Sequence, residues 1–205
     1  MKIKTLSVGE LGTNCYIVTD SKSNAVVIDP ADEFERIVSA LDGCNVGAIL
    51  LTHGHFDHTG AVNQIKARYN ARVIISAEDE EMLSDNTKNA AYLVNASPDP
   101  ITADRLVNDG DVVEVGELVF EVIATGGHTK GSVTYKIGDK LFTGDTLFCG
   151  TVGRCDLYGG NPVKLIRSLQ KLATLEGDFE VFPGHDRKTT LAYEKQTNHY
   201  LRKRK

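Results

Sequence analysis

The sequence is poor in the features that mark specialised classes of protein. It has only 4 cysteines and 5 prolines in 205 residues, and no Cys-x-x-Cys pair. A chain of this length buries about 70% of its unfolded surface on folding, so its core does not need disulfide bonds. We therefore interpret Cys15, Cys44, Cys149 and Cys155 as free thiols.

Long apolar runs and an excess of positive charge are also missing. No segment approaches the roughly 18 apolar residues of a membrane span, and the N-terminus lacks the apolar run of a signal peptide. The formal net charge is −5, which disfavours binding to nucleic acid or to an anionic membrane. We expect a cytoplasmic protein whose partner is a small molecule, and the sequence leaves its oligomeric state open. The basic run at residues 202–205 is interpreted as a solvated helix end.

Short apolar strands alternate with segments of helical periodicity through both halves of the chain. Strands are expected at residues 15–19, 25–28, 46–52, 72–76, 112, 118–123, 133–137, 141–142 and 180–182. Helices are expected at residues 32–41, 58–69, 162–175 and 189–202. Residues 84–106, rich in Ser, Asn and Asp with two prolines, break this rhythm and are expected to form a mobile or lid segment. The order of elements predicts a single α/β domain over residues 1–205.

Three of the six histidines fall within six residues, in the run Thr52-His53-Gly54-His55-Phe56-Asp57-His58. A single buried histidine is commonplace, but this cluster crowds together groups that are easily charged. A cation removes the problem, because neutral imidazole nitrogens and carboxylates bind metals. His53 and His55 follow a buried strand, and in an extended chain their side chains lie on the same face, so they can bind one ion together. Asp57 and His58 lie at the turn into a helix and can face a second ion, and two ions about 3.5 to 4 Å apart form a known hydrolytic arrangement.

Three further ligand types directly follow glycine turns at the ends of predicted strands. They are His128 after Gly127, Asp145 after Gly144 and His185 after Gly184. Each turn by itself also fits a capping role. Together with the first cluster they account for five of the six histidines, which leaves only His199 as an ordinary surface residue.

These motifs together resemble the metal set of the metallo-β-lactamase superfamily, over a match that runs from Asn14 to about Asn198. The run Leu147-Phe148-x-Gly150-x-x-Gly153-Arg154-x-Asp156 resembles its glyoxalase II-like, or hydroxyacylglutathione hydrolase, branch. The resemblance implies an αβ/βα four-layer sandwich with the metals at one edge of two sheets. It also implies two divalent metal ions, the first held by His53, His55 and His128, the second by Asp57, His58 and His185, with Asp145 bridging them.

The same resemblance implies a hydrolase in which a metal-bound hydroxide attacks an acyl carbonyl, while Asp57 orients the water or takes its proton. A thiolate, with an ordinary pKa of about 8.5, leaves without prior protonation, whereas an amide nitrogen must usually gain a proton. No histidine is left over to act as that acid, so a small thioester of the S-acyl glutathione type fits better than a β-lactam. Broad-spectrum β-lactamases of the family moreover have cysteine where this chain has Asp145. Zinc is the expected metal, and the ligands also suit iron and manganese.

Substrate recognition is less well defined by the sequence than the metal site. Arg154 stands where the family often has a basic residue that contacts substrate, and a salt bridge with Asp156 is the alternative interpretation. The chain is expected to lack the helical C-terminal domain through which glyoxalase II enzymes contact glutathione. The open alternatives are a persulfide dioxygenase with one iron in the first ligand set, a lactone or phosphodiester hydrolase of the same fold, and a non-catalytic binding protein. Retention of the second ligand set favours two metals.

Overall fold

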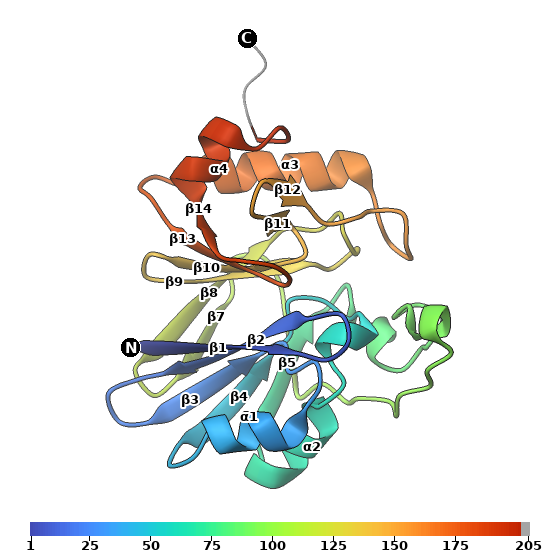
Figure 1. Ribbon diagram of the computed structural model, residues 1–205, viewed down its shortest axis with the longest axis vertical. Helices are drawn as coiled ribbons and strands as arrows, with labels where there is room; N and C mark the ends of the chain where they lie inside the picture. Colours follow the sequence, from blue (N-terminus) through green and yellow to red (C-terminus); the bar gives the residue numbers. More distant parts are fainter. Residues whose placement is uncertain (202–205) are drawn as a thin grey trace.

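The computed structural model describes residues 1–201, so the basic run at 202–205 and the predicted helix end at Arg202 lie outside the described residues. Two sheets face each other, and each carries helices on its outer surface (Figure 1). This arrangement confirms the predicted αβ/βα four-layer sandwich. Within the described residues, no helix is both long enough and apolar enough to cross a membrane.

The first sheet is built mainly from the N-terminal half of the chain. Its order is β1 (Lys2–Val8), β2 (Thr13–Thr19), β3 (Asn24–Ile28), β4 (Asn45–Leu50), β5 (Arg72–Ser76) and β6 (Arg105–Val107). β3 to β6 pair in parallel. α1 (Phe34–Ala40) returns the chain from β3 to β4 and α2 (Val62–Tyr69) from β4 to β5 across the outer face, whereas residues 77–104 connect β5 to β6 without an α-helix. Parallel strands therefore end at one edge of this sheet.

The second sheet is built from the C-terminal half. Its order is β14 (Thr189–Thr190), β13 (Glu180–Pro183), β10 (Lys140–Gly144), β9 (Val133–Ile137), β8 (Leu118–Ala124) and β7 (Val112–Val115). β10 and β13 are parallel, joined through a small hairpin of β11 (Leu147–Phe148) and β12 (Thr151–Val152) and then α3 (Pro162–Ala173). The last helix, α4 (Leu191–Thr197), lies with α3 over the outer face of this sheet (Figure 1).

Strand sequences without polar alternation fill both sides of the first sheet. Val26 and Ile28 of β3 pack between the two sheets, whereas Ala25 and Val27 face α1 and α2. Ile37 is a fully buried contact on the α1 side. In β4, Ile49 faces the helices while Ala48 and Leu50 face the second sheet, so the buried strand predicted at 46–52 is covered on both faces, as expected for the interior of an α/β sheet.

Several predicted boundaries are wrong for local reasons. The helix predicted at 58–69 begins at Val62, because Phe56–His58 form a 3₁₀ turn (η1) that holds ligand candidates. The helix predicted at 189–202 is shorter, because Thr189–Thr190 pair with β13 and the chain becomes extended at Asn198. The sequence analysis missed β1 and the hairpin of β11 and β12 altogether.

The predicted lid segment contains the 3₁₀ turn η3 (Ala91–Val94), preceded by η2 (Glu80–Leu83), and its last residues join the first sheet as β6. Three consecutive apolar side chains of η3, Tyr92, Leu93 and Val94, are about half exposed. Motion of this segment stays a prediction.

Candidate metal centre

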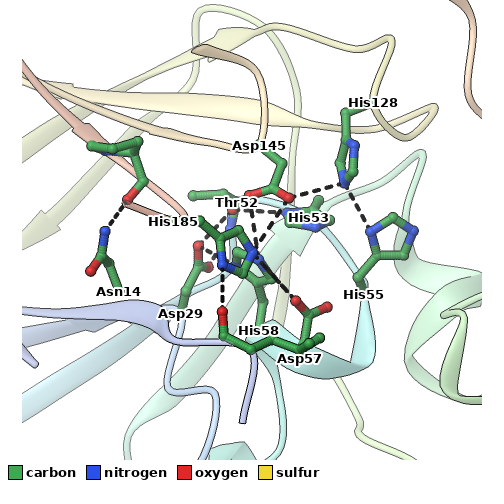
Figure 2. Close-up of polar contacts among 12 residues, drawn as sticks. Asn14, Asp29, Thr52, His53, His55, Asp57, His58, His128, Asp145 and His185 are labelled. Carbon is green, nitrogen blue, oxygen red and sulfur yellow. Dashed lines mark hydrogen bonds and ion pairs between the residues drawn. The ribbon is translucent and has the colours of Figure 1, made fainter. Parts of the chain in front are cut away.

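Seven side chains predicted as metal ligands come together at one edge of the sandwich, where strands end (Figure 2). The chain reaches this edge after β4, β8, β10 and β13, and each time places a histidine or an aspartate there. These residues are His53, His55, Asp57, His58, His128, Asp145 and His185. Carboxyl ends of strands in α/β sheets commonly form ligand sites, because the connecting loops can present side chains there.

The first group consists of His53, His55 and His128, which are all buried. One ligand atom from each lies within 4.8 Å of the others. The Nε2 atom of His128 lies 2.9 Å from the Nδ1 atom of His55, although 73 residues separate them in sequence. Three imidazoles that face one another in this way can share a single cation.

The second group consists of Asp57, His58 and His185, of which His58 is fully buried. The Oδ2 atom of Asp57 lies 3.4 Å from His185 Nε2 and 3.8 Å from His58 Nε2. This group contains a carboxylate, so it is the more negative of the two.

Asp145 lies between the groups and touches both. Its Oδ1 atom is 3.4 Å from His58 Nε2, and its Oδ2 atom is 3.5 Å from His128 Nε2 and 3.6 Å from His185 Nε2 (Figure 2). A carboxylate with one group on each side is suitably placed to bridge two ions.

Hydrogen bonds at the outer nitrogens orient four of the imidazoles. His58 Nδ1 donates to the Asp29 carboxylate, and His128 Nδ1 and His185 Nδ1 donate to backbone carbonyls, at 2.7 to 3.2 Å. The Thr52 hydroxyl donates its proton to Asp29 and can therefore only accept from His53, so His53 Nδ1 donates to Thr52 Oγ1. In the neutral imidazoles, Nε2 then carries no proton and directs its lone pair into the centre. This is the tautomer that a metal requires.

Four buried atoms at this centre have no hydrogen-bond partner among the described residues: His53 Nε2, His55 Nε2, His58 Nε2 and Asp145 Oδ1. Leaving one buried polar atom unsatisfied costs about 1–3 kcal/mol. His53, His58 and Asp145 form one group with ligand atoms within 4.8 Å of one another, whereas His55 turns Nδ1 rather than Nε2 toward His128. The orphaned atoms of His53, His58 and Asp145 therefore fit a cation, which would accept several lone pairs at once. The residues present therefore fit the divalent metals that the fold binds.

The two groups differ in their affinity for protons. Burial and the neighbouring histidines hold the pKa of His53 well below its ordinary value, and burial lowers the pKa of His55 to about 3. Burial also opposes a charge on His58, but the carboxylates of Asp145, Asp57 and Asp29 outweigh it and raise the His58 pKa well above its ordinary value. The negative potential that attracts a proton to the second group also attracts a metal ion.

We expect metal binding to release protons. Because the pKa of His58 is raised, this imidazole carries a proton at pH 7 in the metal-free protein, and a metal ion must displace it from Nε2. Burial opposes a charge on His185, but the carboxylates of Asp57 and Asp145 outweigh it and raise the pKa of His185 as well. Binding at the second group should therefore release roughly one to two protons per ion, and its affinity should fall as pH falls. Calorimetric titration with Zn²⁺ in buffers of different ionisation enthalpy measures this number. A binding enthalpy that is independent of the buffer would contradict the expectation.

Sequence reasoning missed Asp29, which supports the centre from behind. It follows β3 and is buried, and its Oδ2 atom accepts hydrogen bonds from His58 Nδ1 at 3.0 Å and from Thr52 Oγ1 at 2.7 Å. Its Oδ1 atom accepts the Thr52 backbone N–H at 2.8 Å. The available signal was its position: Asp29 ends a strand that lies beside β4, as the ligands end theirs.

Asp79 was also missed, and it joins the two loops that carry the first group. Its carboxylate accepts the backbone N–H of Gly54, the backbone N–H of Gly131 and the hydroxyl of Thr129 at 2.6 to 3.2 Å. Burial raises the pKa of Asp79, and these three hydrogen bonds oppose that rise. Asp79 thus fixes the loop of His53 and His55 against the loop of His128.

Gly184 has no side chain, and Asp145 and His58 occupy the space in which a side chain would lie. A Cβ atom there would overlap Asp145 Oδ1 and lie 2.8 Å from His58 Cε1. We expect Gly184→Ala to weaken metal binding by about 10- to 100-fold without removing a ligand, as displacement of ligand-supporting groups does. Gly47→Ala is the matched control, because the added Cβ would lie 2.5 Å from Val115 Cγ1, at a place remote from the metal centre. This substitution should lower the stability of the fold and leave metal affinity unchanged. Unchanged metal affinity in Gly184→Ala, measured by competition with a chelator, would contradict this geometry.

Arg154 lies beside the centre but does not enter it. Its guanidinium forms a two-pronged salt bridge with Asp156, at 2.7 and 2.9 Å, which is the alternative interpretation that the sequence left open. Its backbone carbonyl accepts the hydrogen bond from His128 Nδ1. Contact of Arg154 with a substrate stays a prediction.

The thiols are not part of the centre. All four cysteines are free, as predicted. Cys149 Sγ lies 3.3 Å from Arg187 Nε, and Cys155 packs against the core beneath α3. His199 is exposed, in the turn after α4.

Comparisons with known proteins agree with this geometry. The sequence model of the metallo-beta-lactamase superfamily matches residues 8–185. The hydroxyacylglutathione hydrolase GloC of Haemophilus influenzae is 33% identical over 208 residues, which cover 98% of each chain. Among solved structures, the B3 metallo-beta-lactamase BLEG-1 has a TM-score of 0.93 at 32% identity, covering 98% of this chain and 99% of that one. TTHA1623, solved in a di-iron-bound form, has a TM-score of 0.87 at 35% identity, covering 97% and 100%.

Proposed function

The chain belongs to the metallo-beta-lactamase superfamily as a metal-dependent hydrolase of that fold, and we propose that its substrates are small thioesters of the S-acyl glutathione type. In this reaction one water molecule is consumed, the acyl carbon–sulfur bond breaks and a carbon–oxygen bond forms. The sulfur leaves with the electron pair of the broken bond. Of the two protons from water, one ends on sulfur and the other is released as the carboxylate forms.

Two divalent ions are proposed to occupy the centre, one among His53, His55 and His128, the other among Asp57, His58 and His185, with Asp145 between them. When bound, such ions supply a Lewis acid that polarises the acyl carbonyl and lower the pKa of a water molecule. Zinc is the proposed metal. Iron and manganese share the same ligand preferences, and iron has a precedent in the di-iron form of TTHA1623.

The observation that carries the proposal is the absence, among the described residues at this centre, of a group suited to protonate a leaving amine. Burial opposes ionisation of Asp57, but His58 and His185 outweigh it and lower the Asp57 pKa. Asp57 is therefore a carboxylate in the resting centre at neutral pH, able to accept a proton from water but holding none of its own for a leaving amine. The histidines of the centre are committed to the ions. A thiol leaving group, with an ordinary pKa of about 8.5, does not need the missing acid.

Similarity to GloC supports the same substrate class, because its name specifies a hydroxyacylglutathione thioester. The likeness to BLEG-1 makes a β-lactam the competing substrate. A persulfide dioxygenase is a weaker alternative, since it needs only one iron in the first group and would leave the ligands of the second group without a metal ion.

The test uses the purified full-length protein loaded with Zn²⁺ or Fe²⁺. We expect the protein to hydrolyse S-lactoylglutathione with a kcat/KM far above that for a cephalosporin such as nitrocefin. The release of the thiol measures the thioester reaction. Oxygen uptake is measured in parallel with glutathione persulfide. Rapid nitrocefin hydrolysis without thioester hydrolysis would overturn the proposal, and so would oxygen consumption by protein holding one iron per chain.

A further inference from the structure

A cavity of about 410 Å³ opens beside Asp57, on the side of the centre that holds the second group. Its walls come from the turn between β1 and β2, from residues 31–32 after β3, from the start of η1, and from residues 94–98 after η3. Cavities of roughly 300–1,000 Å³ that adjoin polar groups typically bind small molecules. The position beside Asp57 gives a ligand in this cavity direct access to the centre.

Apolar side chains line much of this cavity, among them Leu11, Phe56, Val94 and Pro98. Leu11 is 55% exposed and Val94 is 52% exposed, so both have apolar surface that a ligand can cover. Covering apolar surface is favourable by about 25 cal/mol per Å². The cavity therefore favours a ligand with a hydrocarbon portion.

The charged groups in the cavity are all acidic. They are Glu10, Asp32 and Asp57, and no Lys, Arg or His occurs among the described residues that line it. Because Asp57 is a proposed ligand of the second ion, the uncompensated negative charge of the cavity is that of Glu10 and Asp32. Glutathione carries two carboxylates and one ammonium group, a formal charge of −1. Its peptide portion would meet like charge in this cavity, as would any acyl group ending in a carboxylate.

Arg154 lies on the side of the first group, where its backbone carbonyl accepts the hydrogen bond from His128. Its guanidinium is paired with Asp156, so this side has neither the apolar surface nor the unpaired acidic groups of the cavity. A thioester lying across both groups can thus place its acyl chain in the acidic, apolar cavity and leave its peptide portion on the side of Arg154.

The geometry points to this cavity as the acyl pocket of the enzyme, selecting thioesters whose acyl chain is apolar and uncharged. The inference rests on the proposed thioesterase function and narrows it to one substrate class. Lactoyl is short and uncharged but carries a polar hydroxyl, so medium-length alkyl chains are expected to be the better substrates.

Chain length and charge give the first test. With thioesters of one thiol, glutathione, we expect KM to fall roughly two- to fourfold for each methylene added between acetyl and hexanoyl, with kcat little changed. S-succinylglutathione, which is similar in length to the butyryl compound but ends in a carboxylate, should have a kcat/KM at least about tenfold lower, as like charges in one pocket imply.

Variants locate the effect. The double variant Leu11→Ala, Val94→Ala should lose most of the dependence of KM on chain length, because both side chains are exposed and neither is a ligand. The backbone carbonyl of Leu11, which holds His185, is kept. Val163→Ala is the control, since Val163 is 60% exposed on α3 and lies outside this cavity. It should keep the dependence of the unaltered protein.

A binding measurement separates the pocket from the chemistry. S-hexylglutathione and S-methylglutathione are thioethers and cannot be hydrolysed, and the first should bind the zinc-loaded protein at least about tenfold more tightly, by the apolar area it buries. Equal binding of the two, or thioester hydrolysis with a KM independent of chain length, would overturn the inference and leave the proposed function standing. Failure to hydrolyse any thioester would overturn the proposed function, and this inference with it.

Discussion

Replacing Asp145 by asparagine is expected to lower thioester hydrolysis and metal affinity by roughly 10²–10³-fold. The Asp145 carboxylate faces Nε2 of His58, His128 and His185 at 3.4 to 3.6 Å, so it serves both groups. Removing one partner of a buried charged set costs about 3–5 kcal/mol, and each 1.4 kcal/mol corresponds to a tenfold change in affinity. The amide of asparagine keeps the size of the side chain but removes the negative charge between the two ions.

Two measurements on Asp145→Asn check this expectation: metal content per chain after dialysis, and kcat/KM for S-lactoylglutathione. Asp139→Asn is the matched control, because Asp139 is an exposed carboxylate paired with Lys140 in a surface turn. The control should retain both metals and full activity. Metal content and activity that stay at the unaltered level in Asp145→Asn would show that Asp145 is not a bridging ligand.

Replacing Asp29 by asparagine is expected to weaken metal binding at the second group by about 10- to 100-fold, although Asp29 touches no metal site directly. Asp29 Oδ2 accepts protons from both His58 Nδ1 and Thr52 Oγ1. An amide nitrogen in that place donates instead, which favours the opposite His58 tautomer, with its proton on Nε2. The backbone is not the cause, because Asp29 has φ of +50° and asparagine tolerates this left-handed conformation as well as aspartate does.

For Asp29→Asn the informative readout is the NMR chemical shift of the His58 ring nitrogens, combined with zinc affinity by chelator competition. In metal-free protein at a pH above the raised pKa of His58, where the ring carries one proton, we expect that proton to move from Nδ1 to Nε2. We also expect one of the two zinc affinities to drop. Asp42→Asn, an exposed residue after α1, serves as the control and should change neither. Two unaltered zinc affinities in Asp29→Asn would contradict the role assigned to Asp29.

The seven ligand candidates could be predicted because their chemistry is concentrated in the sequence. The run from His53 to His58 is dense in metal-binding types, and His128, Asp145 and His185 each follow a glycine at a strand end. The α/β class was predictable, because apolar runs without polar alternation mark strands buried on both faces, whereas the four-layer sandwich was implied by the resemblance to the metallo-β-lactamase superfamily. Both signals are local and do not require knowledge of which strands are neighbours.

The supporting carboxylates were not predictable in the same way. Asp29 stands alone between the predicted strand at 25–28 and Pro30, and Asp79 lies in a stretch without a motif. Their roles arise from the strand order β3, β4, β5, which brings the segments after these strands to one edge. The acyl pocket is missed for the same reason, since Leu11, Phe56 and Val94 come from separate parts of the chain.

The position of metal ions in crystals of the zinc-loaded protein, read from anomalous scattering at the zinc absorption edge, tests the central claim most directly. We expect two peaks, one within bonding distance of His53, His55 and His128, the other within bonding distance of Asp57, His58 and His185, with Asp145 in contact with both. A single peak, or peaks away from these residues, would contradict the two-metal centre on which the proposed chemistry depends.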